Sequence, residues 1–232
     1  MKYDVEIANV REVSLVGTAD LAYWADRLRP AGLHPTVADG RALLLLVAVA
    51  ARFNGIPFHE LSVSVFLSRE VGGPGRDAGY LVHAYNSIRF FAWVERTFFR
   101  TPYYPASLEV ACGPPASFRV SRGGATLLAA SMASGRQPTR DGDEYWEAPI
   151  YLPGRGREAD ASRLFHAKLS GRTQTYPFEA GKDVLKLAPE SGEPVVALLA
   201  ESHFAGKEWV VRANATHGKS KTVAREMASG VT

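Results

Sequence analysis

The alternation of hydrophobic and polar residues divides most of the chain into short stretches, separated by turns rich in Gly, Pro, Asn and Asp. The stretch from Arg41 to Phe53 is apolar without alternation, which is typical of a strand buried on both faces. After the Asn54-Gly55 turn, Pro57 to Ser68 alternates, so the two stretches predict an antiparallel hairpin. Glu60 is on the polar face of the second arm and is expected to point into solvent or into a polar cavity.

Many further strands are predicted from short β-prone runs between turns. They cover Val13 to Val16, Tyr80 to Tyr85, Tyr104 to Ala111, Ser117 to Val120, Ala125 to Ala133, Tyr145 to Tyr151, Leu164 to Leu169, Thr173 to Phe178, Val195 to Glu201 and Trp209 to Ala215. So many strands with few helices predict an α+β fold, mainly an antiparallel β-barrel or a large curved sheet. No repeat, low-complexity segment or long linker divides residues 1–232, so we expect a single domain.

Two helices are predicted, from Ala19 to Leu28 with Thr18 as N-cap, and from Ile88 to Phe99 with Ser87 as N-cap. In the second helix three arginines fall within one narrow sector, while aromatic residues cover most of the rest. These arginines are Arg89, Arg96 and Arg100. The pattern predicts a largely buried helix with one cationic stripe, which by default is a solvated face or a subunit contact.

Composition and charge narrow the class of protein. The 232 residues are 46% hydrophobic and 22% charged, which is ordinary for a globular protein. The longest apolar run is too short to span a bilayer and the N-terminus carries no signal-peptide pattern, so we expect a cytoplasmic protein without membrane contact. The single cysteine, Cys112, excludes an internal disulfide and a cysteine-based zinc site. The net charge of +3 comes from scattered arginines and gives no nucleic-acid signature.

Two near matches to known motifs carry little weight. His59-Glu60 begins like a zinc-protease helix, but no second histidine follows four residues later and the segment alternates like a strand. The segment from Ala213 to Ser220 ends like a phosphate-binding loop but has Ala in place of the first Gly. Serine-hydrolase and metal motifs are also absent, so no metal or cofactor is expected.

Several short motifs, in order, resemble the acetoacetate decarboxylase-like superfamily. They are Phe58-His59-Glu60 at the start of an alternating strand, Gly79-Tyr80-Leu81 opening the next strand, an arginine-bearing helix, Pro102-Tyr103-Tyr104, Leu152-Pro153 and the phrase DVLKLAP. The resemblance extends over roughly Arg11 to Ser220. It implies a barrel-like cone of strands with helices outside and an internal, partly apolar cavity that binds a small carbonyl compound.

The sequence departs from this family at its catalytic position. In the decarboxylases two lysines follow the proline, and the first forms a Schiff base with the substrate while the second lowers its pKa. Here those positions are Tyr103 and Tyr104, and no lysine occurs between Lys2 and Lys168. Lys168 is the only lysine that we expect could reach a cavity, although a charged outer edge is the favoured position for it. Schiff-base decarboxylation by this mechanism is therefore not expected.

The resemblance assigns the family's aromatic-x-Glu carboxylate to Glu60, its helix arginine to Arg96 and its first-strand arginine to Arg11. A second family carboxylate would fall within Leu43 to Leu46 and is absent. Because Tyr103 and Tyr104 adjoin on a strand, at most one can point inward, and Tyr103 is preferred because it occupies the Schiff-base position.

Other residues complete the predicted site. His83 and Tyr85 share one face of their strand, which is either the cavity or the outer side of the sheet. Together with Arg11, Arg96 and Tyr104 they are the predicted substrate-binding residues. The alternatives are a solvated strand face for the glutamate and ordinary packing for the tyrosines.

The leading hypothesis is an enzyme that acts on a small keto or polyketide-like metabolite by non-covalent acid/base chemistry. Glu60 would transfer the proton and Tyr103 would polarise the carbonyl, giving enolisation, dehydration, hydration or cyclisation. The alternative is a ligand-binding or structural protein that kept the fold and lost the lysine chemistry. A small keto substrate and a second copy of the chain are the expected partners.

Overall fold

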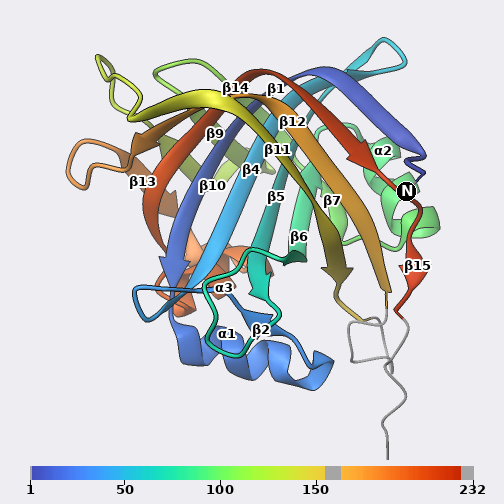
Figure 1. The fold of residues 1–232 in the computed structure, drawn as a ribbon. Helices are drawn as coiled ribbons and strands as arrows, with labels where there is room; N and C mark the ends of the chain where they lie inside the picture. The colour runs from blue at the N-terminus through green and yellow to red at the C-terminus, as the bar shows by residue number, and fades with distance from the viewer. Residues whose placement is uncertain (1, 155–162, 226–232) are drawn as a thin grey trace, which may run out of the picture.

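The computed structural model describes residues 2–154 and 163–225 (Figure 1). The strands are β1 (Val5–Ala19), β2 (His34–Pro35), β3 (Val37–Ala38), β4 (Arg41–Phe53), β5 (Ile56–Ser68), β6 (Ala78–Asn86), β7 (Tyr103–Pro105), β8 (Ser107–Ala111), β9 (Ser117–Arg122), β10 (Ala125–Ser131), β11 (Arg140–Leu152), β12 (Arg163–Pro177), β13 (Val184–Leu187), β14 (Ala205–Lys219) and β15 (Val223–Ala224). The helices are α1 (Leu21–Leu28), α2 (Arg89–Val94) and α3 (Pro194–Glu201), and a π-helical turn, Glu95–Phe99, continues α2. The fold is therefore mainly sheet.

The strands form two sheets. The larger has the order β2-β5-β4-β1-β14-β12-β11-β6-β7, and a further pairing of β5 with β6 returns the path to its own start. The smaller has the order β13-β10-β9-β8 and lies behind the larger one in Figure 1. The predicted sheet-rich α+β fold is confirmed, but the large sheet is mixed, because β6 pairs in parallel with both β11 and β7.

Strand β4 explains why its sequence shows no alternation. Leu44, Leu46 and Ala48 are fully buried in the main hydrophobic cluster, which also includes residues of the small sheet, α1 and α3. The alternate residues, Leu45 and Val47, line an internal cavity. Both faces of β4 are thus covered, as the continuous apolar run predicts, and the Arg41–Phe53 boundaries agree with the prediction.

Several predictions of local structure are wrong. Thr18 belongs to β1, and Asp20 rather than Thr18 caps α1. The apolar run Val195 to Glu201 was expected to be a strand but belongs to α3, which has Pro194 in its first turn. Short apolar runs do not separate a buried helix from a buried strand by periodicity, and Pro at the first helical position is the signal that decides it. The two strands predicted between Leu164 and Phe178 are one strand, β12, which continues through Gly171.

The aromatic helix is shorter and more exposed than predicted. Ser87 is not its N-cap, because the Ser87 hydroxyl accepts a hydrogen bond from His59 N instead. Only Ala92 is buried in α2, whereas Phe90, Trp93 and Phe98 are 62%, 46% and 67% exposed. The expectation of a largely buried helix is therefore wrong. In the part of the chain that the structure describes, no helix has the length and apolar character needed to cross a membrane.

Candidate functional site

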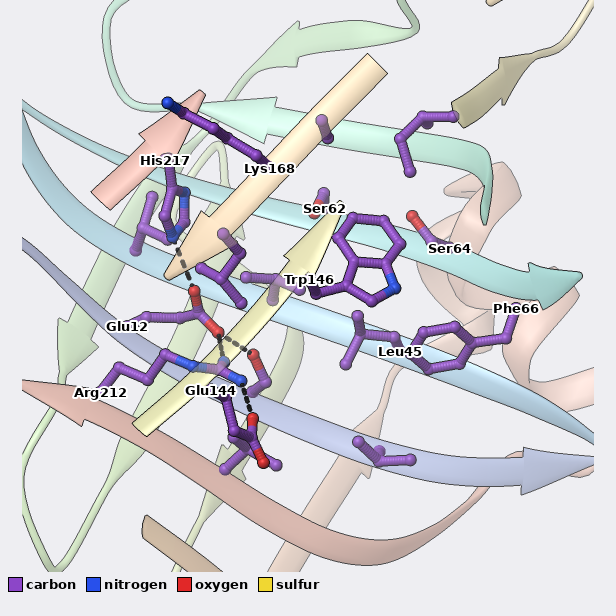
Figure 2. Close-up of a pocket in the computed structure, with 18 of the residues that line it drawn as sticks. Glu12, Leu45, Ser62, Ser64, Phe66, Glu144, Trp146, Lys168, Arg212 and His217 are labelled. Atoms are coloured by element: carbon purple, nitrogen blue, oxygen red, sulfur yellow. Dashed lines mark hydrogen bonds and ion pairs between the residues drawn. The ribbon is translucent and has the colours of Figure 1, made fainter. Parts of the chain in front are cut away.

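A cavity of about 370 Å³, partly open to solvent, lies on the inner face of the large sheet. Its wall is mostly apolar, with Val16, Leu45, Val47, Val49, Phe66, Leu81, Trp146, Ile150, Phe165, Leu169 and Val210 among the lining residues. Polar groups are added by Glu12, Ser14, Glu60, Ser62, Ser64, Arg76, Tyr103, Arg140, Glu144, Lys168, Thr175, Glu208, Arg212, His217 and Lys219. Figure 2 labels Glu12, Ser62, Ser64, Glu144, Lys168, Arg212 and His217 among them. A largely apolar space with a few converging polar groups is typical of a small-molecule site.

The two residues predicted as catalytic meet in this cavity. Tyr103 Oη donates a 2.5 Å hydrogen bond to Glu60 Oε1. Asn86 Nδ2, on the neighbouring strand β6, donates a longer bond of 3.4 Å to the other oxygen, Oε2. Tyr103 is buried while Tyr104 is 38% exposed, as expected from the alternation of side chains along β7. Glu60 and Tyr103 thus form a carboxyl–phenol pair at the cavity wall.

The surroundings of this pair change its acid/base properties. Removal from water raises the pKa of Glu60 to about 7; the Tyr103 hydrogen bond opposes the increase and the charge of Glu95 adds to it. Burial and the nearby Glu60 carboxyl raise the pKa of Tyr103 well above its usual value. At neutral pH, therefore, Glu60 can take up or release a proton, while the phenol keeps its own and acts as a hydrogen-bond donor.

A lysine from a distant part of the chain lies beside the pair. Lys219 Nζ forms an ion pair of 2.5 Å with Glu95 Oε2 and lies 5.6 Å from the centre of the Tyr103 ring. Lys168, for which a charged outer edge was the favoured position, also lines the cavity, and its amine pairs with Glu6. Each of these two amines is thus paired with a carboxylate.

A second carboxylate, Glu12, stands on the same wall. Glu12 pairs with Val49 and Val49 with Glu60 in the strand register, so the two acids are separated by roughly 10 Å at Cα, or two strand spacings. Figure 2 shows the Glu12 carboxylate between Arg212 and His217. Arg212 Nη1 donates at 2.5 Å to Oε1, and His217 Nε2 lies 2.8 Å from Oε2.

Glu12 and Glu60 differ sharply in ionisation. Burial opposes the charged form of Glu12 most strongly, but Arg212 and His217 outweigh it and lower the pKa of Glu12 to about 2. Arg212 is itself fixed by Glu144 Oε2 and by Thr173 Oγ1, each at 2.8 Å. Glu12 is therefore a permanent anion within a closed network, whereas Glu60 is free to titrate near neutrality.

The other sequence-predicted residues lie outside the cavity lining. Arg11 alternates with Glu12 on β1 and is exposed on the opposite side of the sheet. His83, Arg96 and Tyr104 border a second pocket on the other side of β6 and β7. The Tyr85 hydroxyl donates to Glu193 Oε2 at 2.8 Å within the main hydrophobic core. The substrate-binding role of these five residues remains a prediction. None of them lines the cavity that contains Glu60.

Sequence reasoning missed most of the cavity lining, including the charged network residues Glu12, Arg212, His217 and Lys219. The last strand was predicted only from Trp209 to Ala215, whereas β14 continues to Lys219 and carries three of these residues inward. Irregularities in the pairing of β14 with β1 interrupt the alternation along this strand. The sequence pattern therefore did not show that the strand continues to His217 and Lys219. In the described ranges 2–154 and 163–225, no cluster of His, Cys, Asp and Glu could hold a metal ion.

Solved structures resemble this chain at low sequence identity. An acetoacetate decarboxylase from Legionella pneumophila superposes with a TM-score of 0.66 at 10% identity, covering 97% of this chain and 88% of that one. The enduracididine biosynthesis enzyme MppR, complexed with pyruvate, gives a TM-score of 0.61 at 13% identity, with 97% and 91% covered. No protein-family model and no curated protein matches the sequence. The chain therefore has the acetoacetate decarboxylase-like fold.

We predict that Glu60→Gln stabilises the protein at alkaline pH. Because the pKa of Glu60 is raised to about 7 from 4.5, its ionisation in the folded state costs stability increasingly from pH 4.5 to pH 7. At pH 8 the variant should gain about 2–3 kcal/mol in free energy of unfolding. Urea titrations at pH 5 and pH 8 measure the gain, and an equal effect at both values would contradict the desolvation of Glu60.

We predict that Arg212→Met destabilises the fold by about 3–5 kcal/mol, because the Glu12 carboxylate would lose its main compensating charge while remaining buried. The double variant Glu12→Gln with Arg212→Met should recover a large part of the loss, since the buried charge is then gone. Urea unfolding of the wild type, both single variants and the double variant measures this coupling. Additive losses would show that the two side chains do not depend on each other.

Proposed function

We propose that this protein is an enzyme of the acetoacetate decarboxylase-like type that catalyses proton transfer next to the carbonyl of a small keto compound. The contact between Tyr103 and Glu60 inside an apolar cavity carries the proposal. Ionised Glu60 removes a proton from the carbon beside the carbonyl. Once the Glu60 carboxyl is protonated it no longer accepts the Tyr103 hydrogen bond, and the hydroxyl turns to donate that bond to the substrate oxygen, which becomes an enolate. Enolisation, dehydration or hydration, and cyclisation all use this step.

The similar structures support a keto substrate. One structure of MppR contains pyruvate, and another contains the condensation product of pyruvate and imidazole 4-carboxaldehyde. A condensation of this kind proceeds through an enol or enamine of the keto acid. The Lys219 amine lies near the Tyr103 ring at the same end of the cavity, where it is paired with Glu95.

The proposal also covers the domain organisation, the cellular location and the oligomeric state of the protein. We place residues 1–232 in a single barrel-like domain that works in the cytoplasm as a homo-oligomer, without a metal or an organic cofactor. A polyketide-like metabolite fits the apolar walls provided by Phe66, Trp146 and Phe165. The alternative of a binding protein without chemistry would leave the titratable Glu60 without a role.

We predict that the protein accelerates exchange of the methyl protons of pyruvate with deuterium. The exchange rate should rise with pH, half-maximally near pH 7, because Glu60 acts as a base only when ionised. Glu60→Gln should lower the rate by about 100-fold or more, and Tyr103→Phe by about 10- to 100-fold. Proton NMR in heavy water measures the rate.

The matched control is Tyr104→Phe, since Tyr104 adjoins Tyr103 but does not line the cavity. If pyruvate is too small a substrate, larger 2-keto acids and 1,3-diketones are measured in the same way. Full activity of both Glu60→Gln and Tyr103→Phe on any compound that the wild type enolises would refute the assignment. Exchange no faster than in buffer for every compound would favour the binding protein.

We predict no covalent adduct when pyruvate and borohydride are added together. Both cavity amines are paired with carboxylates, Lys168 with Glu6 and Lys219 with Glu95, so neither is the free amine that forms a Schiff base. Intact-protein mass spectrometry measures the result. A stable mass increase that is lost in Lys219→Met or Lys168→Met would locate a Schiff-base lysine and overturn the non-covalent mechanism.

A further inference from the structure

The network around Glu12 includes a histidine that the proposed proton transfer does not use. Glu12 Oε1 accepts hydrogen bonds from Arg212 Nη1 at 2.5 Å and from Ser14 Oγ at 2.8 Å, while His217 Nε2 lies 2.8 Å from Oε2. The second nitrogen of the imidazole, Nδ1, makes no hydrogen bond in the part of the chain that the structure describes. One polar atom at the end of this network is therefore left for a ligand.

The Glu12 carboxylate decides which nitrogen of His217 carries the proton. Although burial opposes the charge, Arg212 and His217 lower the pKa of Glu12 to about 2, so this carboxylate only accepts hydrogen bonds. His217 consequently donates from Nε2, and Nδ1 of the neutral ring carries a lone pair. An imidazole held in this way offers its other nitrogen as a proton acceptor, or as a donor once the ring has gained a second proton.

The imidazole faces the same cavity as Glu60. The His217 side chain is 30% exposed and lines the cavity together with Glu60 and Tyr103, and its Nδ1 is not among the buried polar atoms that lack a partner. Burial raises the pKa of Glu60 to about 7, and the charge of His217 is among the smaller contributions that lower it. Figure 2 shows the imidazole at one end of the Glu12 carboxylate and the Arg212 guanidinium at the other.

Two acid/base groups on one cavity allow more than enolisation. Glu60 and Glu12 are separated by roughly 10 Å at Cα, so a small molecule between them can contact both Glu60 and the imidazole that Glu12 holds. Enolisation needs only a base and a donor to the carbonyl oxygen. A further acid is needed where a carbon–oxygen bond breaks, because hydroxide leaves slowly unless it is protonated as it departs.

We propose that His217, oriented by Glu12, is the general acid of a dehydration in this cavity, and that the substrate is a β-hydroxy keto compound. The inference rests on the proton transfer proposed for Glu60 and names its substrate class. Glu12 is a positioning residue, since it acts through the imidazole. The same groups in the reverse direction would hydrate an α,β-unsaturated keto compound.

The step balances within the cavity. Glu60 takes the α-proton, and the electron pair of that C–H bond forms the enolate. The enolate then forms the double bond between the α- and β-carbons and breaks the bond from the β-carbon to oxygen, and the departing oxygen takes the Nδ1 proton of His217. The products are an α,β-unsaturated keto compound and water, and the Glu60 proton returns to His217 through solvent.

A 4-hydroxy-2-keto acid in heavy water tests the proposal on the full chain. Proton NMR follows two rates on this compound: deuterium exchange of the α-protons, which needs Glu60, and formation of the unsaturated product, which also needs the acid. His217→Ala should lower the ratio of dehydration to exchange by about 100-fold or more, because the α-proton is still removed while hydroxide leaves slowly. Imidazole added to this variant should restore much of the dehydration, since the cavity is partly open.

The matched control is His166→Ala. His166 is a partly buried histidine of β12, the strand that pairs with β14, and does not line the cavity. Both rates should equal those of the wild type. If His217→Ala does not fold by circular dichroism, His217→Gln gives the same test, because its amide can still donate to Glu12 but cannot act as the acid.

Several outcomes would overturn the role of His217: an unchanged ratio in the variant, an equal loss of both rates, or a loss that imidazole does not restore. A wild type that exchanges the α-protons without forming the unsaturated product would overturn the dehydration and leave the proton transfer by Glu60 intact. Exchange no faster than in buffer, with pyruvate and with the hydroxy acid, would instead refute the proton transfer itself and this inference with it.

Discussion

The large sheet curves round so that β6, near one end of the strand order, pairs with β5, near the other end. The side chains on its inner face therefore point toward one another. Strands β1, β4 and β5 bury one face against the small sheet and the short helices (Figure 1). Their other face lines the cavity. Of the two acids on this wall, Glu12 of β1 is only 2% exposed and Glu60 of β5 is partly buried. The pKa of each acid then depends on the side chains that the strand register places beside it.

Glu12 and Glu60 show how strongly neighbouring side chains can change the pKa of a carboxyl group. Both stand at the same level of the sheet, on either side of Val49. Arg212 and His217 hold Glu12 as a permanent anion, and the pKa falls to about 2. Glu60 has a phenol and an amide as its direct partners, so desolvation prevails and the pKa rises to about 7. Arg212 holds Glu12 in its ionised form, whereas Glu60 can exchange a proton near neutral pH and is the acid available for catalysis.

The dipeptide Tyr103-Tyr104 connects the two hollows of the molecule. Because consecutive residues of a strand face opposite ways, Tyr103 reaches Glu60 while Tyr104 stacks on His83. The arginines of the α2 segment are correspondingly divided: Arg96 and Arg100 border the second pocket, and Arg89 is exposed elsewhere. On a regular helix the three arginines would lie on one face. In the structure they lie in different surroundings, because a π-helical turn follows α2.

The sequence alone determined the sheet-rich fold and the β4–β5 hairpin, because turn residues and period-two alternation are local signals. It left open whether Glu60 faces solvent or a cavity, and the preference for Tyr103 over Tyr104 came from the family resemblance. It did not determine α3, whose short apolar run fits helix and strand equally, nor the exposure of the α2 aromatics, which depends on what packs against them. Only the tertiary structure brought Lys219 beside Tyr103 and Arg212 beside Glu12, since strand neighbours far apart in the chain are set by sheet order. For the same reason it placed Arg11 and His83 outside the cavity: a shift of one residue along a strand reverses the face, and no local pattern reveals which face is enclosed.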